Sequence, residues 1–217
     1  AGTSGFAFRF FAEFHTGVTL FFVLCGFIIT HKYFLTPSTS LSVYFWNRFT
    51  KIYPVFFILT VLTFLARVIY FSQFGEKEIL ALILNLLLLK GYFQEFLFSG
   101  IAQAWTLTVE ETFYLSAPLL ALAWKKWRLP LLLLPLTIIS SGILIQNLFK
   151  DLFPFGFLRD LQFLFNFTFF GRCFEFLLGM GLAYHMQRRL PLKHLTLIGA
   201  AGILLSIMAL AMIGNEE

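Results

Sequence analysis

Long runs of apolar residues alternate with short polar segments along the whole chain. The runs cover residues 6–30, 52–71, 105–124, 129–149, 161–184 and 195–213. A helix needs about 20 mostly apolar residues to cross the hydrocarbon core of a bilayer. The pattern therefore predicts an all-α protein, a polytopic bundle of transmembrane helices with about six to seven hydrophobic segments in a single integral-membrane domain, residues 1–217.

A further apolar run, residues 79–89, is short for a crossing, and the mixed segment 90–103 follows it. Basic loops prefer the cytoplasmic side of a membrane. Three basic segments separate the apolar runs: 31–51, 125–128 and 188–193. All three share one side only if the number of crossings between the first and the second is even. We therefore expect residues 79–103 to be irregular or re-entrant.

Composition supports lipid as the solvent of this chain. Hydrophobic residues make up 59% and charged residues 12% of it, whereas a soluble domain carries about 25% charged residues. The formal charge of +5 comes from residues between the apolar runs, so it indicates a membrane surface and no nucleic-acid partner. Cys25 and Cys173 lie inside apolar runs and are expected to be buried thiols without a disulfide. The four histidines show no metal-ligand spacing, so no metal site is expected.

The segment 105–118, WTLTVEETFYLSAP, carries two adjacent carboxylates at the head of an apolar run. An ionisable group inside a membrane segment is costly and usually faces a protein interior or a cavity. Thr106, Glu110 and Tyr114 recur every four residues, which places them on one helix face as a polar lining. Glu111 points about 100° away, and we expect it to cap or pair structurally. The alternative is that both Glu residues lie at a helix N-terminus, where the helix dipole favours negative charge.

Aromatic and basic residues interleave over residues 44–54, as they do at a membrane–water interface. On a helix, Arg48 and Lys51 share a face that is suited to an anionic group such as a phosphate. The alternative is a basic loop that touches only lipid headgroups.

A second charged pair lies inside the run 161–184. Arg172 and Glu175 are three residues apart, so they can pair within the membrane and lower the cost of burying each charge. The pair is either functional or only structural. Gly171, Glu175 and Gly179 form a stripe along which small residues let a neighbouring helix approach.

Four stretches together resemble the membrane acyltransferase-3 family, multi-pass O-acyltransferases that modify surface glycans. They are GVTLFFVLCGFII (17–29), RFTKIYP (48–54), WTLTVEETFYL (105–115) and RCFEFLLGM (172–180). Cys25 stands where the family usually has Ser, and Lys51 stands where it has a second Arg. The order of the four stretches is that of the family, and they extend over residues 17–180.

The resemblance implies acyl-CoA, with acetyl-CoA as the expected form, as a donor on the cytoplasmic side and no permanently bound cofactor. It also implies a hydroxyl acceptor on a cell-surface polysaccharide or glycolipid, and about ten spans in a bacterial cytoplasmic (inner) membrane. The family's catalytic histidine lies in the first helix, about ten residues after an Arg. No such pair occurs here, and His15 is close to Gly17, so we expect that helix to be missing or incomplete in a chain that is a fragment at both ends.

The candidate site follows from these motifs. The catalytic candidates are Glu110 and Glu111, and His15 is a weaker one. The candidates for binding the phosphates of acyl-CoA are Arg48 and Lys51. The expected cavity lining consists of Thr106, Tyr114, Arg172 and Glu175. The alternatives are a transporter or flippase, in which buried charges mark a substrate path without chemistry, and a non-catalytic fragment.

Overall fold

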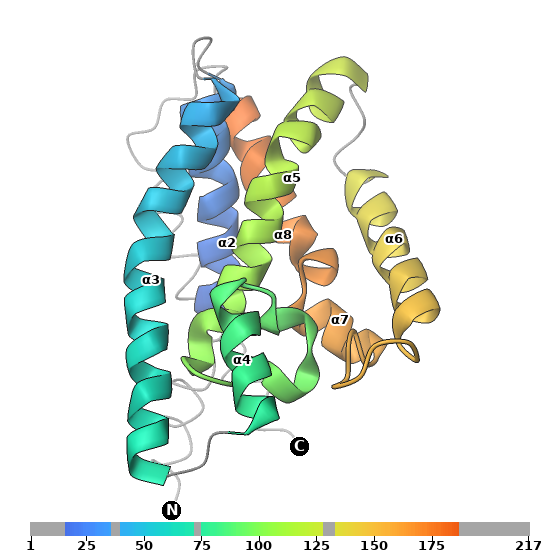
Figure 1. Ribbon diagram of the computed structural model, residues 1–217. Coiled ribbons are helices and arrows are strands. Elements are labelled where there is room, and N and C mark those ends of the chain that lie inside the picture. Colours follow the sequence, from blue (N-terminus) through green and yellow to red (C-terminus); the bar gives the residue numbers. More distant parts are fainter. Residues whose placement is uncertain (1–15, 36–39, 72–74, 128–132, 187–217) are drawn as a thin grey trace, which may run out of the picture.

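The computed structural model describes residues 16–35, 40–71, 75–127 and 133–186. Most of these residues are helical, and among them there is no strand, apart from one antiparallel bridge between Phe93 and Phe157. The α-helices (Figure 1) are α2 (Thr16–Ile29), α3 (Leu41–Phe71), α4 (Glu76–Leu86), α5 (Trp105–Trp127), α6 (Leu133–Phe149), α7 (Leu161–Phe167) and α8 (Phe169–Met186). The predicted all-α class is confirmed, while the predicted crossing at 195–213 lies outside the described residues.

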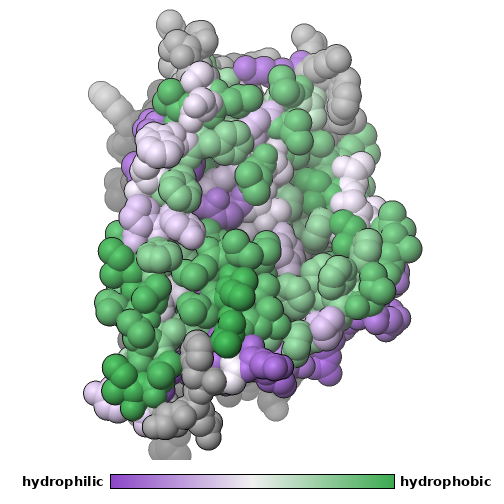
Figure 2. Space-filling model, viewed as in Figure 1, coloured by the Kyte–Doolittle hydropathy of each residue, from purple (hydrophilic) through white to green (hydrophobic). Residues whose placement is uncertain are grey.

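The described residues contain three helical stretches that are long and apolar enough to cross a membrane. They are Gly17–Phe34, Leu41–Tyr70 and Leu161–Met186. Hydrophobic side chains cover much of the face shown in Figure 2, and hydrophilic ones gather along its lower edge. A hydrophilic patch also interrupts the hydrophobic surface in the upper half, between α3 and α5. The chain is therefore an integral membrane protein with polar groups inside its apolar zone.

The interfacial segment 44–54 and the span 52–71, which the sequence suggested as separate elements, form one helix, α3. It has 31 residues with Pro54 inside it, so it is about 46 Å long. This length exceeds the roughly 30 Å of a bilayer's hydrocarbon core. A helix of this length extends beyond the hydrocarbon core.

Several helices meet at the end of the bundle where the described residues of the basic segments 31–51 and 125–127 lie. The first, α2, continues through a π-helical turn, η2 (Thr30–Phe34), beyond the end expected at His31 and Lys32. Lys125 Nζ donates to the carbonyl oxygen of Phe34 at 2.9 Å, and Trp124 stacks on Tyr184 at 5.4 Å. The start of α3 and the ends of α5 and α8 lie at this same end (Figure 1). The basic segments 31–51 and 125–127 thus share one end, while the segment 188–193 lies outside the described residues.

The segment between α3 and α5 is irregular, as the sequence predicts. Its helix α4 has 11 residues, which is too short for a crossing. Three short 3₁₀ turns follow: η3 (Lys90–Tyr92), η4 (Gln94–Phe96) and η5 (Ala102–Ala104). The segment begins and ends at the end of the bundle opposite the basic segments (Figure 1).

The run 161–184, expected as one helix, is broken at Thr168. The backbone there is extended, with φ −115° and ψ 161°, and separates α7 from α8. The break folds the chain tightly, because a Cβ at Gly171 would lie 2.2 Å from the Cα of Phe165. Gly171 therefore permits this tight turn. The expectation that it lets a neighbouring helix approach is wrong.

The core forms where α2, α5 and α8 meet. Phe22, Phe113 and Phe176 are fully buried, and their rings stack at 4.7 Å (Phe22 with Phe176) and 4.2 Å (Phe113 with Phe176). The helices α2 and α8 approach closely at Gly26 and Gly179, where an added Cβ would meet backbone of the other helix at 2.1 and 2.0 Å. The predicted role of Gly179 in helix approach is thus confirmed.

Candidate functional site

Glu110 and Tyr114 form a buried pair on α5. Glu110 is 3% exposed, and its Oε2 accepts a hydrogen bond of 2.8 Å from the Tyr114 hydroxyl. Its Oε1 has no hydrogen-bond partner among the residues that the structure describes. Because α5 starts at Trp105, Glu110 lies beyond the first turn, where the helix dipole acts most strongly. The predicted shared face of Glu110 and Tyr114 is confirmed, and the alternative of two N-terminal carboxylates is not supported.

Arg48 reaches this pair from α3. Its guanidinium carbon lies 5.1 Å from the ring centre of Tyr33 and 5.4 Å from that of Tyr114, distances typical of cation–π contacts. Its charge acts on both Glu110 and Glu111. Arg48 Nε is buried and, within the described part of the chain, has no hydrogen-bond partner. The Nε–H donor of Arg48 is therefore unsatisfied inside this group of side chains.

Tyr44 and Cys25 complete the surroundings of Tyr114. The Tyr44 hydroxyl donates to the backbone oxygen of Tyr114 at 2.9 Å, which ties α3 to α5. Cys25 Sγ lies 3.9 Å from the Tyr114 hydroxyl, and both cysteines of the chain are free thiols, as expected. We call this group the α3–α5 polar cluster; it consists of Cys25, Tyr33, Tyr44, Arg48, Glu110 and Tyr114.

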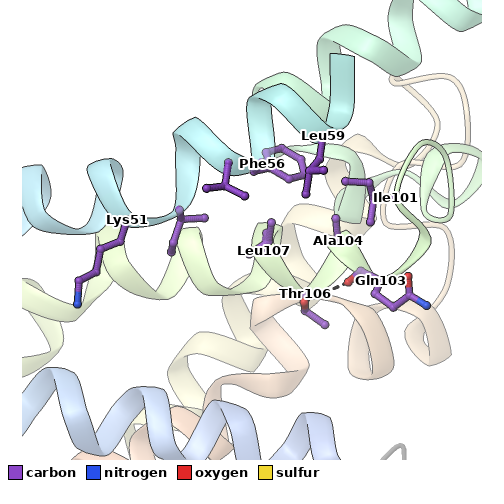
Figure 3. A pocket seen from close by; sticks show the side chains of 10 residues that line it. Lys51, Phe56, Leu59, Ile101, Gln103, Ala104, Thr106 and Leu107 are labelled. Atoms are coloured by element: carbon purple, nitrogen blue, oxygen red, sulfur yellow. Dashed lines mark hydrogen bonds between the residues drawn. The ribbon is translucent and has the colours of Figure 1, made fainter. Parts of the chain in front are cut away.

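Lys51 lies in different surroundings from Arg48, although both leave α3 towards α5. It is exposed and stands at one end of a groove of about 440 Å³ between α3 and the start of α5. Figure 3 shows Lys51 at one end, Gln103 and Thr106 at the other, and apolar side chains such as Phe56, Leu59 and Leu107 between them. Arg48 thus lies in the cluster and Lys51 at the groove, and their joint binding of an anion stays a prediction.

Thr106 and Glu111 depart from their expected surroundings. The Thr106 hydroxyl donates to the backbone oxygen of Gln103 at 3.1 Å and lines the groove, so it makes no bond to Glu110. Glu111 is half-buried and makes no hydrogen bond or ion pair with any described residue. Among the described residues Glu111 therefore has no capping or ion-pair partner, although the charge of Arg48 lies close enough to act on it.

Arg172 and Glu175 form the predicted ion pair on α8, with 2.7 Å between Arg172 Nη1 and Glu175 Oε1. Thr19 of α2 joins it, because its hydroxyl donates to Glu175 Oε1 at 2.9 Å. Arg172 Nε also donates to the backbone oxygen of Asn166 at 2.9 Å. The charges are 21% and 15% exposed. The group links α2, α7 and α8, and among the described residues no hydrogen bond or ion pair joins it to Glu110.

Sequence reasoning missed Thr19, Tyr33 and Tyr44. A single Thr inside an apolar run carries no signal of its own. Tyr33 and Tyr44 flank the basic segment that contains Arg48, and aromatic residues there are equally expected from the membrane interface alone. His15, a catalytic candidate, lies outside the described residues.

Comparison with known proteins places these motifs in context. The chain matches the family described as Acyltransferase domain over residues 2–216. Nodulation protein 10 of Rhizobium leguminosarum bv. viciae is 29% identical over 150 residues, which are 60% of this chain and 40% of that protein. Peptidoglycan O-acetyltransferase OatA of Listeria monocytogenes serovar 1/2a is 30% identical over 148 residues, 59% of this chain and 23% of that protein. The chain thus spans less than half the length of these relatives. No solved structure matches it.

Proposed function

This chain belongs to the acyltransferase family whose domain it matches, and we propose that it carries part of a membrane O-acyltransferase. The reaction moves an acyl group, with acetyl as the expected case, from cytoplasmic acyl-CoA to a hydroxyl of a cell-surface polysaccharide or glycolipid. The observation that carries the proposal is the contact of Arg48 with Tyr114, which in turn binds Glu110. It brings a cation suited to phosphate next to a buried carboxylate suited to proton transfer.

The donor end of the proposed site is the end of the bundle where the basic segments lie. Acyl-CoA carries phosphates, and hydrogen bonds between a guanidinium and phosphate oxygens are stronger than those between neutral groups. The half-buried Arg48 would present its guanidinium to the phosphates, and Lys51 would add an exposed ammonium at one end of the groove. The positive-inside rule puts this end on the cytoplasmic side of a bacterial inner membrane, where acyl-CoA is available.

The transfer needs one base and one site that stabilises negative charge. The acceptor hydroxyl oxygen attacks the thioester carbonyl carbon and loses its proton to the base. The carbon–sulfur bond then breaks, and the base returns the proton to the departing sulfur, so that coenzyme A leaves as the thiol. Glu110 Oε1 is a candidate base, since Tyr114 holds the other carboxylate oxygen in place. The guanidinium of Arg48 would offset the charge that develops on the carbonyl oxygen.

The remaining candidates would either bind the acceptor or stabilise the packing of helices around the site. Arg172 and Glu175, held by Thr19, lie near the start of α8, away from the basic end (Figure 1). There they would meet glycan hydroxyls or brace α2 against α8. Glu111 and His15 stay candidates for the base. The reaction as proposed uses no permanently bound cofactor or metal, and it involves no nucleic acid.

A titration of acetyl-CoA into the detergent-solubilised full-length parent tests the donor site. We expect Arg48→Ala to weaken binding about 10-fold or more, because a hydrogen bond to a charged group contributes about 1.5–3 kcal/mol. Arg67→Ala is the matched control, since Arg67 is an arginine on the same helix whose guanidinium lies over the Phe64 ring, at 6.0 Å. Unchanged affinity of Arg48→Ala would leave the lipid-headgroup alternative and refute the donor site.

A further inference from the structure

Two hydrogen bonds join the turn η3 to α5. The backbone N–H of Gly91 donates to Thr108 Oγ1 at 3.1 Å, and the hydroxyls of Tyr92 and Thr112 are 2.6 Å apart. Tyr92 is the donor of this second bond, because the Thr112 hydroxyl donates to the backbone oxygen of Thr108 at 2.7 Å. Thr108 and Thr112 are one helical turn apart, so both contacts hold the same side of α5.

The turn is itself held by a buried cation. Lys90 is 1% exposed, and its Nζ donates to the backbone oxygens of Ser99 and Ile101 at 2.7 and 2.6 Å. Asn85 binds the Ser99 hydroxyl at 2.8 Å. A buried ammonium is costly unless its hydrogen bonds are satisfied, so these carbonyls hold Lys90, and with it the turn, in one position.

Rotation of α5 determines where Glu110 points. Glu110 lies two residues from both Thr108 and Thr112, hence about 160° around the helix from each of them. The turn η3 therefore binds the side of α5 opposite the Glu110 carboxylate. If α5 turned by about 20°, a side chain about 5–6 Å from the helix axis would move by about 2 Å.

We propose that Tyr92, carried on the turn that Lys90 anchors, is a positioning residue for the acyl transfer. Its hydroxyl holds Thr112 and thereby sets the rotation of α5, which directs Glu110 and Tyr114 towards Arg48. Tyr92 acts through Glu110 and touches no substrate. The inference rests on the proposed function for the consequence in catalysis, whereas the control of helix rotation stands on the contacts of η3 alone.

Kinetics of the full-length parent give the first test. Tyr92→Phe and Thr112→Val each remove the same bond, and we expect each to lower kcat about 10-fold or more, because a displacement of about 1 Å can cost about 100-fold. Acyl-CoA affinity should stay unchanged. The double variant should lose no more than either single variant, since no second bond remains to be broken. Tyr70→Phe is the control, because Tyr70 is 82% exposed.

Alkylation of Cys25 gives a readout that needs no activity. Cys25 Sγ lies beside the Tyr114 hydroxyl, so a rotated α5 uncovers the thiol. N-ethylmaleimide modification of the Cys25 peptide, followed by mass spectrometry, should become several-fold faster in Tyr92→Phe and Thr112→Val, and should stay at the wild-type rate in Tyr70→Phe.

The two readouts separate the inference from the proposed function. Slower transfer together with faster alkylation supports both. Wild-type alkylation rates in both variants overturn the positioning role, whatever the kinetics show. Faster alkylation in a parent protein that neither binds acyl-CoA nor transfers acyl groups leaves the control of helix rotation standing and overturns the proposed function.

Discussion

The contact of α2 with α8 has no room for one more methyl group at Gly179. A Cβ there would lie 2.0 Å from the backbone oxygen of Val23 and 2.8 Å from the backbone nitrogen of Phe27. Non-bonded carbon atoms rest at about 3.5–4.0 Å. Since backbone atoms of a helix cannot move aside singly, Gly179→Ala has to separate the two helices by about 1.5 Å.

The separation would weaken the best-packed part of the bundle. The rings of Phe22 and Phe176 stack at 4.7 Å, and Thr19 binds Glu175 at 2.9 Å across the same interface. Adding a methylene to a well-packed core costs about 1–3 kcal/mol. For a chain of this size, each kcal/mol lowers the melting temperature by about 2–4 °C. We therefore expect Gly179→Ala to lower it by about 2–12 °C.

Thermal unfolding of the detergent-solubilised full-length parent measures this effect. Gly17→Ala is the matched control on α2, because a Cβ at Gly17 meets nothing within 4 Å, and it should melt with the wild type. If Gly179→Ala also melts within a degree of the wild type, the helices are not in the close contact described, and the packing argument is wrong.

Three further predictions follow from the site and its surroundings. Glu110→Gln should leave folding intact and cut acyl transfer per folded protein about 10-fold or more, whereas Glu111→Gln should act mainly on expression or thermal stability; an active Glu110→Gln beside an inactive, well-folded Glu111→Gln contradicts the assignment. In intact cells, Ser40→Cys should be protected from an impermeant thiol reagent and Gly75→Cys should be labelled, and labelling at position 40 would invert the proposed orientation. Burial lowers the pKa of Lys90 from 10.5 to about 8, so between these pH values the unfolded chain binds more protons than the folded protein. The free energy of unfolding should therefore rise with pH from about 8 to 10.5. Lys90→Met should show a smaller rise, and an equal rise in both proteins would refute the burial of a charged Lys90.

Several features of this protein were accessible from the sequence because they depend only on local spacing or on composition. Apolar runs of spanning length predicted the helical membrane class. Four-residue spacing sufficed to place Glu110 and Tyr114 on one helix face, and three-residue spacing sufficed to predict that Arg172 pairs with Glu175. The brevity of residues 79–89 and the positions of the basic segments predicted the irregular segment.

Contacts between helices were decided by the tertiary structure alone. Spacing placed Arg48 and Lys51 on one helix face, but only the tertiary structure shows that Arg48 contacts Tyr33 and Tyr114 while Lys51 lines the groove. Lys90 carried no signal in the sequence, but the chain folds back so that its ammonium is enclosed by the carbonyls of Ser99 and Ile101. Such contacts depend on how far each helix is rotated about its axis and on where the chain turns. These are set by side-chain packing across many residues, which hydrophobic periodicity along one segment does not encode.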